Sequence, residues 1–382
     1  MKGICLWMGV LGASGVRGIY AGRRNVLRGL NGVSCDVEGC GRCCGGVCDD
    51  GFAVLNNRPA RVSEEKRKAI ADAAKKLNYV PNQSARSLVT KQSQLVALIV
   101  PDIENLFFAA LAKCVEDECA AQGYSLIVAN SDDSRAAEHE LLQRLPARGV
   151  DGVMLIPARE SCVGSAVEQL CEDVALVSCP VVLIDRLTQC GWCDAVGFDN
   201  YLGGRLAAQY LLEGGHTRIG IVTGDIAESS AAERRRGFVD AIEQSGKHFD
   251  SSLCVEGDYR FDSGYRAANQ IIDGGATAVF CCNDVMALGF RQRMAERGLH
   301  VTEDMQVIGY DNILKRFGLG WRMTTVEQSV TDLAAACWGM LRKRIDVAVR
   351  AKSGTESGDA RPWLSDPQVE VLTPKLVQAA CA

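Results

Sequence analysis

Short apolar runs that alternate with amphipathic stretches of helix length constrain the fold of this chain more than any other feature. The runs begin about residue 95 and lie at Leu95–Val100, Ser125–Val128, Val153–Ile156, Val181–Ile184, Ile219–Val222, Ala278–Cys281 and Val307–Gly309. Such runs, separated by helices, are typical of βαβ units whose parallel strands are buried on both faces. The series is too long for one compact sheet, so we predict an α/β fold with two doubly wound, parallel-sheet lobes.

The rest of the chain divides around this pattern. We expect the two lobes to span residues 93–350, one built from about 93–197 with 326–350 and the other from 198–325. Residues 351–382 are interpreted as a C-terminal tail. Ligands of doubly wound folds bind at the carboxyl ends of the strands, so the residues just after each apolar run are the first candidates for a binding site.

Residues 54–92, upstream of the lobes, combine helix signals with a cluster of positive charge. Ser63 suits the N-cap of a helix that runs to Leu77, and Pro81 suits the first turn of a shorter helix over Asn82–Leu88. The whole chain has a net charge of −5, so any contact with nucleic acid has to come from a local basic patch. The basic residues here are Arg58, Arg61, Lys66, Arg67, Lys68, Lys75, Lys76, Arg86 and Lys91, against Glu64, Glu65 and Asp72. A solvated helix face is the alternative interpretation.

The chain has 18 cysteines, several of them crowded near its start. Four of these have spacings that four zinc thiolate ligands could share: Cys40, Cys43, Cys44 and Cys48. Two of the four are adjacent, which fits a zinc-binding loop poorly, and no apolar core surrounds them. Cys190 and Cys193 have the spacing of a redox motif, but they follow a predicted strand, in what we interpret as an exposed loop, and not the helix N-terminus that would lower a thiol pKa. We therefore interpret that pair as coincidental and predict no metal site and no cofactor.

No apolar run approaches the roughly 18 residues that a membrane helix needs, so we predict no membrane span. Lys2 followed by the apolar stretch Ile4–Val10 has some features of a signal peptide, which would indicate a secreted binding protein. The basic segment before the lobes argues against secretion, and we expect a cytoplasmic protein.

Polar and aromatic side chains follow several of the predicted strands. They are Asp102, Asn105, Phe107 and Phe108 after the first strand, and Asp185-Arg186, Asn283-Asp284 and Asp311-Asn312 after later ones. Carboxylates and amides can bind the hydroxyls of a polyhydroxylated ligand, and aromatic rings can cover its C–H surface. The alternative is that each Asp or Asn merely caps the helix that follows.

The chain resembles the LacI family of bacterial transcription regulators from Val54 to about residue 350. The resemblance begins with VLNNRPARVSEEKRKAIADAAKKLNYVPNQSARSLVTKQSQLVALIVPDIENLFF and continues in order with RGVDGVMLIP, GGHTRIGIVTG, RRGFVDAI, CNDVMALGF and VIGYDN. Each motif alone is weakly specific, but together they are highly specific. The resemblance implies that the lobes form a sensor domain of the periplasmic-binding-protein-like type I fold.

The family resemblance also implies an effector cleft between the two lobes. Its expected residues are Phe107, Phe108, Asp185, Arg234, Asn283 and Asp311. Two positions depart from the family pattern: Leu106 stands where proline is usual, and Ala232 stands where many sugar-binding members have an arginine. The second departure puts the familiar sugar class in doubt, although Arg234 is close enough in sequence to substitute.

For DNA, the resemblance implies a helical headpiece remnant followed by a hinge helix that orders on the operator. The implied DNA-binding residues are Asn56, Asn57, Arg61, Tyr79, Asn82, Arg86 and Leu88. Leu88 would be the wedge that kinks the minor groove. We expect a homodimer, because two DNA half-sites require two headpieces, and a small sugar or sugar derivative whose binding closes the lobes and changes operator binding.

Two other classes of function are alternatives to a regulator. An enzyme would need signals that the sequence lacks: a Gly-rich phosphate fingerprint after the first strand, a G-x-S-x-G elbow, or histidines at a metal spacing. We therefore predict that the chain is not an enzyme. A sugar-binding protein that does not bind DNA, either cytosolic or secreted, remains the alternative.

Residues 1–53 do not fit the family pattern, which starts abruptly in the middle of the place where a helix-turn-helix should lie. A one-base shift of the reading frame lets the codons for Gly39–Ala53 encode residues that complete the first helix and turn of a LacI-type headpiece. The same shift accounts for the excess of cysteine, because TGC followed by G becomes an alanine codon. We therefore interpret residues 1–53 as out-of-frame or disordered, with most of the DNA-reading headpiece lost.

Overall fold

The computed structural model describes residues 63–65, 67, 68, 72, 92–187, 191–227, 229–319, 323–352 and 361–379. The chain separates into two compact units, Met1–Arg86 and Ser87–Ala382. In the first unit, the described residues after Ser63 are helical, and the amide of Arg67 donates to the carbonyl of Ser63 at 3.0 Å, as the predicted helix requires. The predicted hinge helix, Asn82–Leu88, lies outside the described residues.

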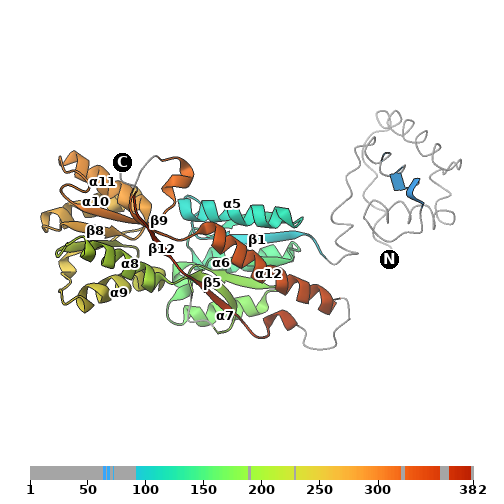
Figure 1. Ribbon diagram of the computed structural model, residues 1–382. Helices are drawn as coiled ribbons and strands as arrows, with labels where there is room; N and C mark the ends of the chain where they lie inside the picture. Colours follow the sequence, from blue (N-terminus) through green and yellow to red (C-terminus); the bar gives the residue numbers. More distant parts are fainter. Residues whose placement is uncertain are drawn as a thin grey trace, which may run out of the picture. The chain divides into compact units, whose positions relative to one another are not determined.

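The first lobe of the second unit is built on a parallel sheet with the strand order β11-β5-β4-β3-β1-β2. Its strands are β1 (Leu95–Val100), β2 (Ser125–Asn130), β3 (Gly152–Leu155), β4 (Val181–Ile184), β5 (Asp194–Phe198) and β11 (Val369–Leu372). Its helices are α5 (Leu106–Ala121), α6 (Arg135–Ala147), α7 (Ala166–Leu176) and α12 (Val330–Lys352). Buried side chains of α5 and α12 pack on one face of the sheet, and those of α6 and α7 pack on the other. Figure 1 shows these helices around the strands of the first lobe. Both faces are therefore covered, which explains the continuous apolar runs.

The second lobe repeats this plan with the strand order β12-β10-β9-β8-β6-β7. Its strands are β6 (Ile219–Thr223), β7 (Cys254–Glu256), β8 (Ala278–Cys281), β9 (Gln306–Asp311), β10 (Thr325–Glu327) and β12 (Lys375–Val377). Its helices are α8 (Asn200–Glu213), α9 (Ser229–Gln244), α10 (Phe261–Asp273) and α11 (Asp284–Glu296). All of its pairs are parallel except that of β12 with β10. Each predicted apolar run forms a strand, so the prediction of two doubly wound lobes is confirmed.

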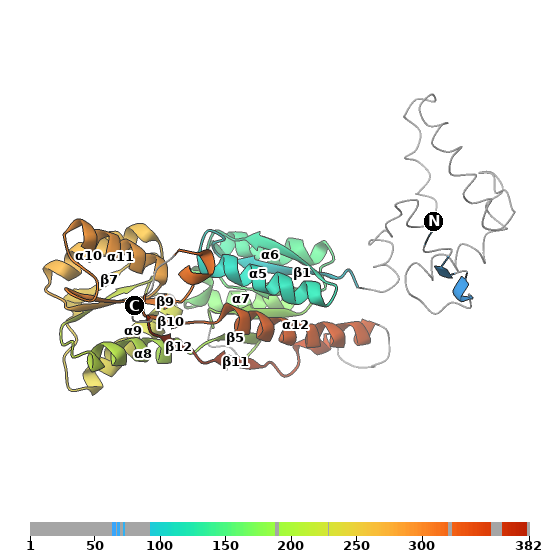
Figure 2. The ribbon, with the colours of Figure 1, turned by 45° about the horizontal axis from the view of Figure 1, so that its top comes forward.

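The C-terminal segment, interpreted from the sequence as a tail, contributes a strand to each of the two sheets. β11 pairs in parallel with β5 and β12 pairs antiparallel with β10, so residues after α12 complete the edge of both sheets. Arg344 on α12 holds this segment: its guanidinium donates to the carboxylate of Asp194 at 2.6 and 2.8 Å, and to the carbonyl of Ser365 at 2.8 Å. Figure 2 shows the segment running along both lobes.

The chain passes between the lobes several times. β5 of the first lobe leads through Asp199 into α8 of the second, and β10 leads back through Gln328 into α12. Between β9 and β10 the chain also makes an excursion in which Ile313 and Leu314 are buried in the core of the first lobe. The two lobes are thus joined by several segments, which is the arrangement a hinged pair of lobes requires.

Two further predictions can be compared with the structure. Cys193 is buried, and its thiol donates to the carbonyl of Val181 at 3.5 Å, so the interpretation of its surroundings as an exposed loop was wrong: the short strand β5, which begins at the next residue, draws it into the core. Cys190 lies outside the described residues. In the described part of the chain, no helix combines the length and apolar character that a bilayer crossing demands.

Candidate ligand-binding site

A cavity of about 470 Å³ lies where the carboxyl ends of strands from both sheets meet. Most of its lining residues lie at or after the carboxyl ends of β1, β2, β3, β4, β6, β7, β8 and β9; Ser230 and Arg234 lie on α9, and Gln328 follows β10. All six residues expected at an effector cleft line it: Phe107, Phe108, Asp185, Arg234, Asn283 and Asp311. A volume of this size suits a small ligand.

The cavity also has residues that the sequence reasoning did not assign to it. They include Asn130, Asp132, Asp133, Arg159, Asp225, Ser230, Asp258, Tyr259, Arg260 and Gln328. Asp132 and Asp133 lie two and three residues after β2, and Asp258, Tyr259 and Arg260 lie two to four residues after β7. Applying the strand-end argument to β2 would have found the first pair, whereas β7 is too short and too half-buried to be recognised as an apolar run.

Phe107 and Phe108, at the start of α5, give the cavity an apolar wall. Both are buried, and their rings meet edge to face with centroids 5.6 Å apart. Asn105 is the N-cap of the helix, and its side-chain oxygen accepts from the amide of Phe107 at 3.0 Å. The cap therefore fixes the position of the two rings at the carboxyl end of β1.

Arg234 on α9 lies buried beside the cavity and is held on every side. Its Nε donates to Asn200 Oδ1 at 2.8 Å, its Nη1 to the carbonyl of Cys282 at 2.8 Å, and its Nη2 to Gln328 Oε1 at 3.2 Å. The guanidinium carbon also lies 3.9 Å from the centre of the Tyr310 ring. Asn200 and Gln328 belong to the segments that connect the lobes, so the position of Arg234 is set at the hinge. Each nitrogen uses one N–H in these bonds, which leaves one N–H on Nη1 and one on Nη2 for a ligand.

Burial lowers the pKa of Arg234, but the nearby Tyr310, Tyr259, Asp311 and Asp185 more than reverse this and raise it above its ordinary value. Arg234 is therefore charged under all relevant conditions. Two of the neighbours that stabilise its charge are carboxylates of the cavity, so cation and anions face the same space.

Asp311 ends β9 and is 8% exposed. Burial raises the pKa of its carboxyl well above the ordinary value, while Arg234 acts in the opposite direction. Among the described residues, no hydrogen bond to the Asp311 carboxylate is present, although the group lines the cavity. A buried carboxylate without hydrogen bonds is costly, so Asp311 gains from a ligand that donates one.

Asn283 also lines the cavity, but its amide is engaged within the protein. The oxygen caps α11 by accepting from the amide of Met286 at 2.8 Å, and Nδ2 donates to the carbonyl of Tyr259 at 2.8 Å. Asn283 is therefore both a helix cap and a residue of the cavity, the two alternatives that the sequence left open. Its neighbour Asp284 is buried and points away to Ile313 and Thr325, and burial raises its pKa to about 6.

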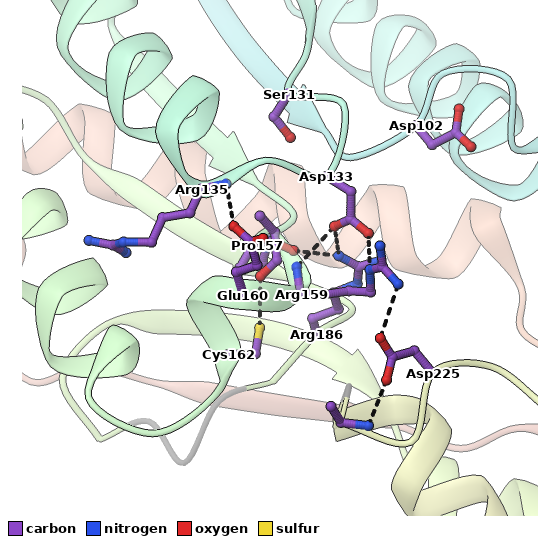
Figure 3. Close-up of polar contacts among 12 residues, drawn as sticks. Asp102, Ser131, Asp133, Arg135, Pro157, Arg159, Glu160, Cys162, Arg186 and Asp225 are labelled. Atoms are coloured by element: carbon purple, nitrogen blue, oxygen red, sulfur yellow. Dashed lines mark hydrogen bonds and ion pairs between the residues drawn. The ribbon is translucent and has the colours of Figure 1, made fainter. Parts of the chain in front are cut away.

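A network of charges forms the wall contributed by β2, β3 and β4 (Figure 3). Asp133 accepts from Arg186 Nη1 at 2.6 Å and from the amide of Arg159 at 2.9 Å, and it also pairs with the Arg159 guanidinium. Burial raises the pKa of Asp133, but the two arginines outweigh it and hold the pKa below its usual value. Glu138 on α6 fixes the Arg159 loop by accepting from the amide of Ala158 at 2.5 Å.

Two arginines bridge the lobes across the mouth of the cavity. Arg159 of the first lobe reaches Asp225 of the second, with Nη1 and Oδ2 3.1 Å apart. Arg260 of the second lobe reaches Asp102 and Glu104 of the first at 2.8 and 3.1 Å. Two sets of ion pairs between residues that line the cavity thus link the two lobes.

Several cavity residues have a backbone conformation that side chains other than glycine rarely adopt. The φ angles are +51° for Asp132, +53° for Asp133, +64° for Asp185, +63° for Tyr259 and +98° for Asp311. Such conformations persist where the surrounding structure imposes them, and they cluster at binding sites. Their concentration here supports the cavity as the functional site of the lobes.

No group of three or more His, Cys, Asp or Glu side chains in the described part of the chain is arranged to hold a metal ion. The four cysteines weighed as a zinc site lie outside the described residues, as do all seven predicted DNA-binding residues, Asn56, Asn57, Arg61, Tyr79, Asn82, Arg86 and Leu88.

Known proteins resemble this chain over most of its length. A family model described as a periplasmic binding protein domain matches residues 96–330. The HTH-type transcriptional repressor PurR of Pasteurella multocida (strain Pm70) is 34% identical over 303 residues, which cover 79% of this chain and 89% of the repressor. Catabolite control protein A of Priestia megaterium is 32% identical over 293 residues, which cover 76% of this chain and 86% of that protein.

Solved structures agree with these relatives. The complex of the transcriptional regulator CelR with cellobiose is 26% identical, with a TM-score of 0.63, and the match covers 86% of this chain and 94% of CelR. A LacI family transcriptional regulator from Enterococcus faecium with bound ribose is 26% identical, with a TM-score of 0.61. The match covers 74% of this chain and 97% of that regulator.

Proposed function

This chain belongs to the LacI family of transcription regulators, and on that premise we propose that its two-lobed unit binds a small polyhydroxylated effector in the cavity and thereby controls binding to operator DNA. The observation that carries the proposal is the cavity itself, where strand ends of both lobes bring apolar rings, a fixed guanidinium and a buried carboxylate to one place. The solved relatives with cellobiose and with ribose support a ligand of the sugar class.

Each part of the cavity has a role in this proposal. Phe107 and Phe108 cover the C–H face of the ligand, while Asp311 accepts hydrogen bonds from its hydroxyls and the two remaining N–H groups of Arg234 donate to its oxygens. Asn283 holds the Tyr259 loop, and it bonds a hydroxyl only with the capacity left after its internal bonds. Ligand bound between the lobes favours the closed arrangement, because only that arrangement contacts it from both sides.

Closure is proposed to act on DNA through the segment that precedes β1. In a cytoplasmic homodimer, closing the lobes changes the separation of the paired hinge segments and so their helical state, with Leu88 as the wedge in the minor groove. If residues 1–53 are out of frame, the chain lacks its recognition helix, and its basic segment gives only weak, salt-sensitive phosphate contacts.

The effector site is tested by calorimetry on the full chain with a panel of neutral sugars, including D-ribose, D-glucose and cellobiose. For a sugar that binds, Asp311→Ala should weaken the affinity about tenfold or more, since a lost buried hydrogen bond costs about 1–3 kcal/mol. Asp273→Ala is the control, because that carboxylate pairs with Arg297 on the surface, away from the cavity. Equal affinities for the Asp311 variant and the unmodified chain would contradict the assignment.

The DNA-binding part is tested by sequencing the codons for residues 1–60 and by selection from random duplex DNA. The chain as given should enrich no sequence, whereas a chain restored to the shifted frame should enrich a two-fold symmetric site whose binding responds to effector. In the restored chain, Leu88→Ala should reduce operator bending in a circular-permutation gel. A stop codon in the shifted frame, or tight sequence-specific binding by the chain as given, would contradict the proposed frame change.

A further inference from the structure

The charges around the cavity are strongly unbalanced. Among the described residues, eight carboxylates line it: Asp102, Glu104, Asp132, Asp133, Asp185, Asp225, Asp258 and Asp311. Four guanidinium groups line it, those of Arg159, Arg186, Arg234 and Arg260, with no lysine or histidine. The lining therefore has an excess of four acidic groups. Two of the eight carboxylates, Asp185 and Asp311, are buried, and low exposure strengthens their electrostatic interactions.

Three of the arginines are already committed to carboxylates at the wall and the mouth. Arg159 and Arg186 pair with Asp133, and Arg159 also pairs with Asp225. Arg260 pairs with Asp102 and Glu104. These arginines hold the loops and the lobes together, and their charge is not available to balance the interior.

Among the described lining residues, Arg234 is therefore the one arginine outside these ion pairs. Arg234 faces both Asp311 and Asp185, whose charges raise its pKa. Asp258 remains ionised, because hydrogen bonds from Ser263 and from the amide of Arg260 outweigh burial and lower its pKa. Asp311 is more than nine-tenths buried and lines the cavity without a hydrogen bond from any described residue. A cationic group beside Asp311 would satisfy both the unpaired carboxylate and the charge imbalance.

We infer that the effector is a sugar or polyol bearing a protonated amino group, which lies against the carboxylate of Asp311. The inference rests on the proposed function, since it specifies the ligand of the same cavity. The excess of acidic groups also discriminates against anionic ligands, such as sugar phosphates and sugar acids, which would meet like charges on entry. Neutral sugars lack the charge but share the hydroxyls, so they are the closest competitors.

Matched pairs of ligands test the amine inference separately from the proposal that the cavity binds a sugar. Calorimetry near neutral pH compares D-glucosamine with D-glucose, D-galactosamine with D-galactose, and 1-amino-1-deoxysorbitol with sorbitol; D-ribose, cellobiose and D-glucose 6-phosphate are added. We expect an amine to bind at least about tenfold more tightly than its neutral counterpart, and the phosphate not to bind. A neutral sugar that binds as tightly as its amine would overturn the amine inference and leave the sugar sensor standing. No binding by any compound would contradict both.

Variants identify the carboxylate involved. Asp311→Asn keeps the shape and removes the charge, so it should remove most of the preference for the amine while changing the affinity for the neutral partner much less. Glu104→Gln is the matched control, because Glu104 also lines the cavity but its side chain is 75% exposed and bonded to Arg260. An unchanged preference in Asp311→Asn would overturn the placement of the amine.

The affinity also has a pH signature that a structural role for Asp311 would not give. The amine needs Asp311 ionised, and burial raises the pKa of that carboxyl. Amine affinity should therefore rise with pH through the Asp311 titration, until the amine itself loses its proton. Binding should release a proton, seen as a dependence of the heat on the buffer, and Asp311→Asn should abolish both effects. A pH-independent affinity with no proton release would contradict the inference.

Discussion

The two lobes share one strand order, yet their helices pack in different ways. In the second lobe the helices cross in pairs through glycines: a Cβ on Gly204 of α8 would lie 2.0 Å from the carbonyl oxygen of Arg234 on α9, and one on Gly237 of α9 would lie 1.9 Å from that of Tyr201 on α8. The α10–α11 pair has the same kind of contact through Gly264 and Gly289. In the first lobe, α5, α6 and α7 contain no glycine, and a Cβ on Gly339 of α12 would meet nothing within 4 Å.

This difference matches what each lobe contributes to the cavity. The second lobe brings backbones together and so fixes Arg234, whose own carbonyl lies at a glycine crossing. The first lobe packs through larger side chains, such as Trp338 and Leu111, and presents rings and paired charges. We conclude that the second lobe provides the rigid part of the site, and the following predictions test that conclusion.

The largest effect is expected for Arg234→Ala. The change removes one buried donor each from Asn200, Gln328 and the carbonyl of Cys282, and it removes the cation that lowers the pKa of Asp311. We expect the free energy of unfolding in urea to fall by about 4 kcal/mol, as for other broken buried ion networks. Arg236→Ala, which removes an exposed pair with Glu233, should change it by less than about 1 kcal/mol. Similar values for both would refute a special role for Arg234.

Gly237→Ala should be the next most severe, because the added carbon would meet backbone that cannot rotate away. We expect a loss of about 3 kcal/mol of unfolding free energy. Gly339→Ala in the first lobe is the matched control, and it should stabilise by about 0.5–1 kcal/mol, since alanine is the better helix former. If both substitutions lower the free energy of unfolding, or both raise it, the proposed difference in helix packing between the lobes is wrong.

Each lobe also has a buried carboxylate that holds a cavity loop, Glu138 in the first and Asp284 in the second. Burial raises the pKa of Asp284 to about 6, above its unfolded value of about 3.9. Its contribution to stability is therefore full below about pH 4 and is lost as pH rises through about 6. Asp284→Asn should remove about 2–3 kcal/mol of this pH dependence between about pH 4 and 7, measured by urea titrations. If the unfolding free energy of the variant depends on pH as that of the unmodified protein does, Asp284 does not titrate in this range.

The smallest effect concerns the ion pairs that join the lobes. Arg260 is more than half exposed, so Arg260→Ala should weaken binding of a confirmed effector by no more than about 1 kcal/mol. The loss should shrink at high salt, because exposed charges are screened. Calorimetry at two salt concentrations measures this, and a loss that persists at high salt would show that Arg260 contacts the ligand directly.

Much of this architecture was predictable because parallel strands buried on both faces leave continuous apolar runs. β5 was missed because Asp194 and Gly197 interrupt its five residues, although all five are buried. β7, β10 and β12 have three residues each, too few for a pattern, and β11 is mostly exposed at a sheet edge.

Residues of the cavity were predictable where a polar residue lies directly at the end of a strand, as Asp185 and Asp311 do. The family resemblance added Arg234, which lies within a helix and follows no strand. Arg159 and Asp225 were not identified, because their roles arise from pairing with each other across the lobes, between residues 66 positions apart in the chain. A single sequence holds no local signal for such a pair.

The two edge strands at the end of the chain have a consequence for how the protein is made. The amide of Gln368, next to β11, bonds Asp194 at the start of β5, which is 174 residues earlier. Contacts so distant in sequence form late and slowly. Until residues 369–377 leave the ribosome, the β5 edge of one sheet and the β10 edge of the other keep unpaired N–H and C=O groups that can recruit strands from other chains. The segment with β11 and β12 thus protects both lobes from aggregation at once, and the nascent protein depends on it before it has any ligand to bind.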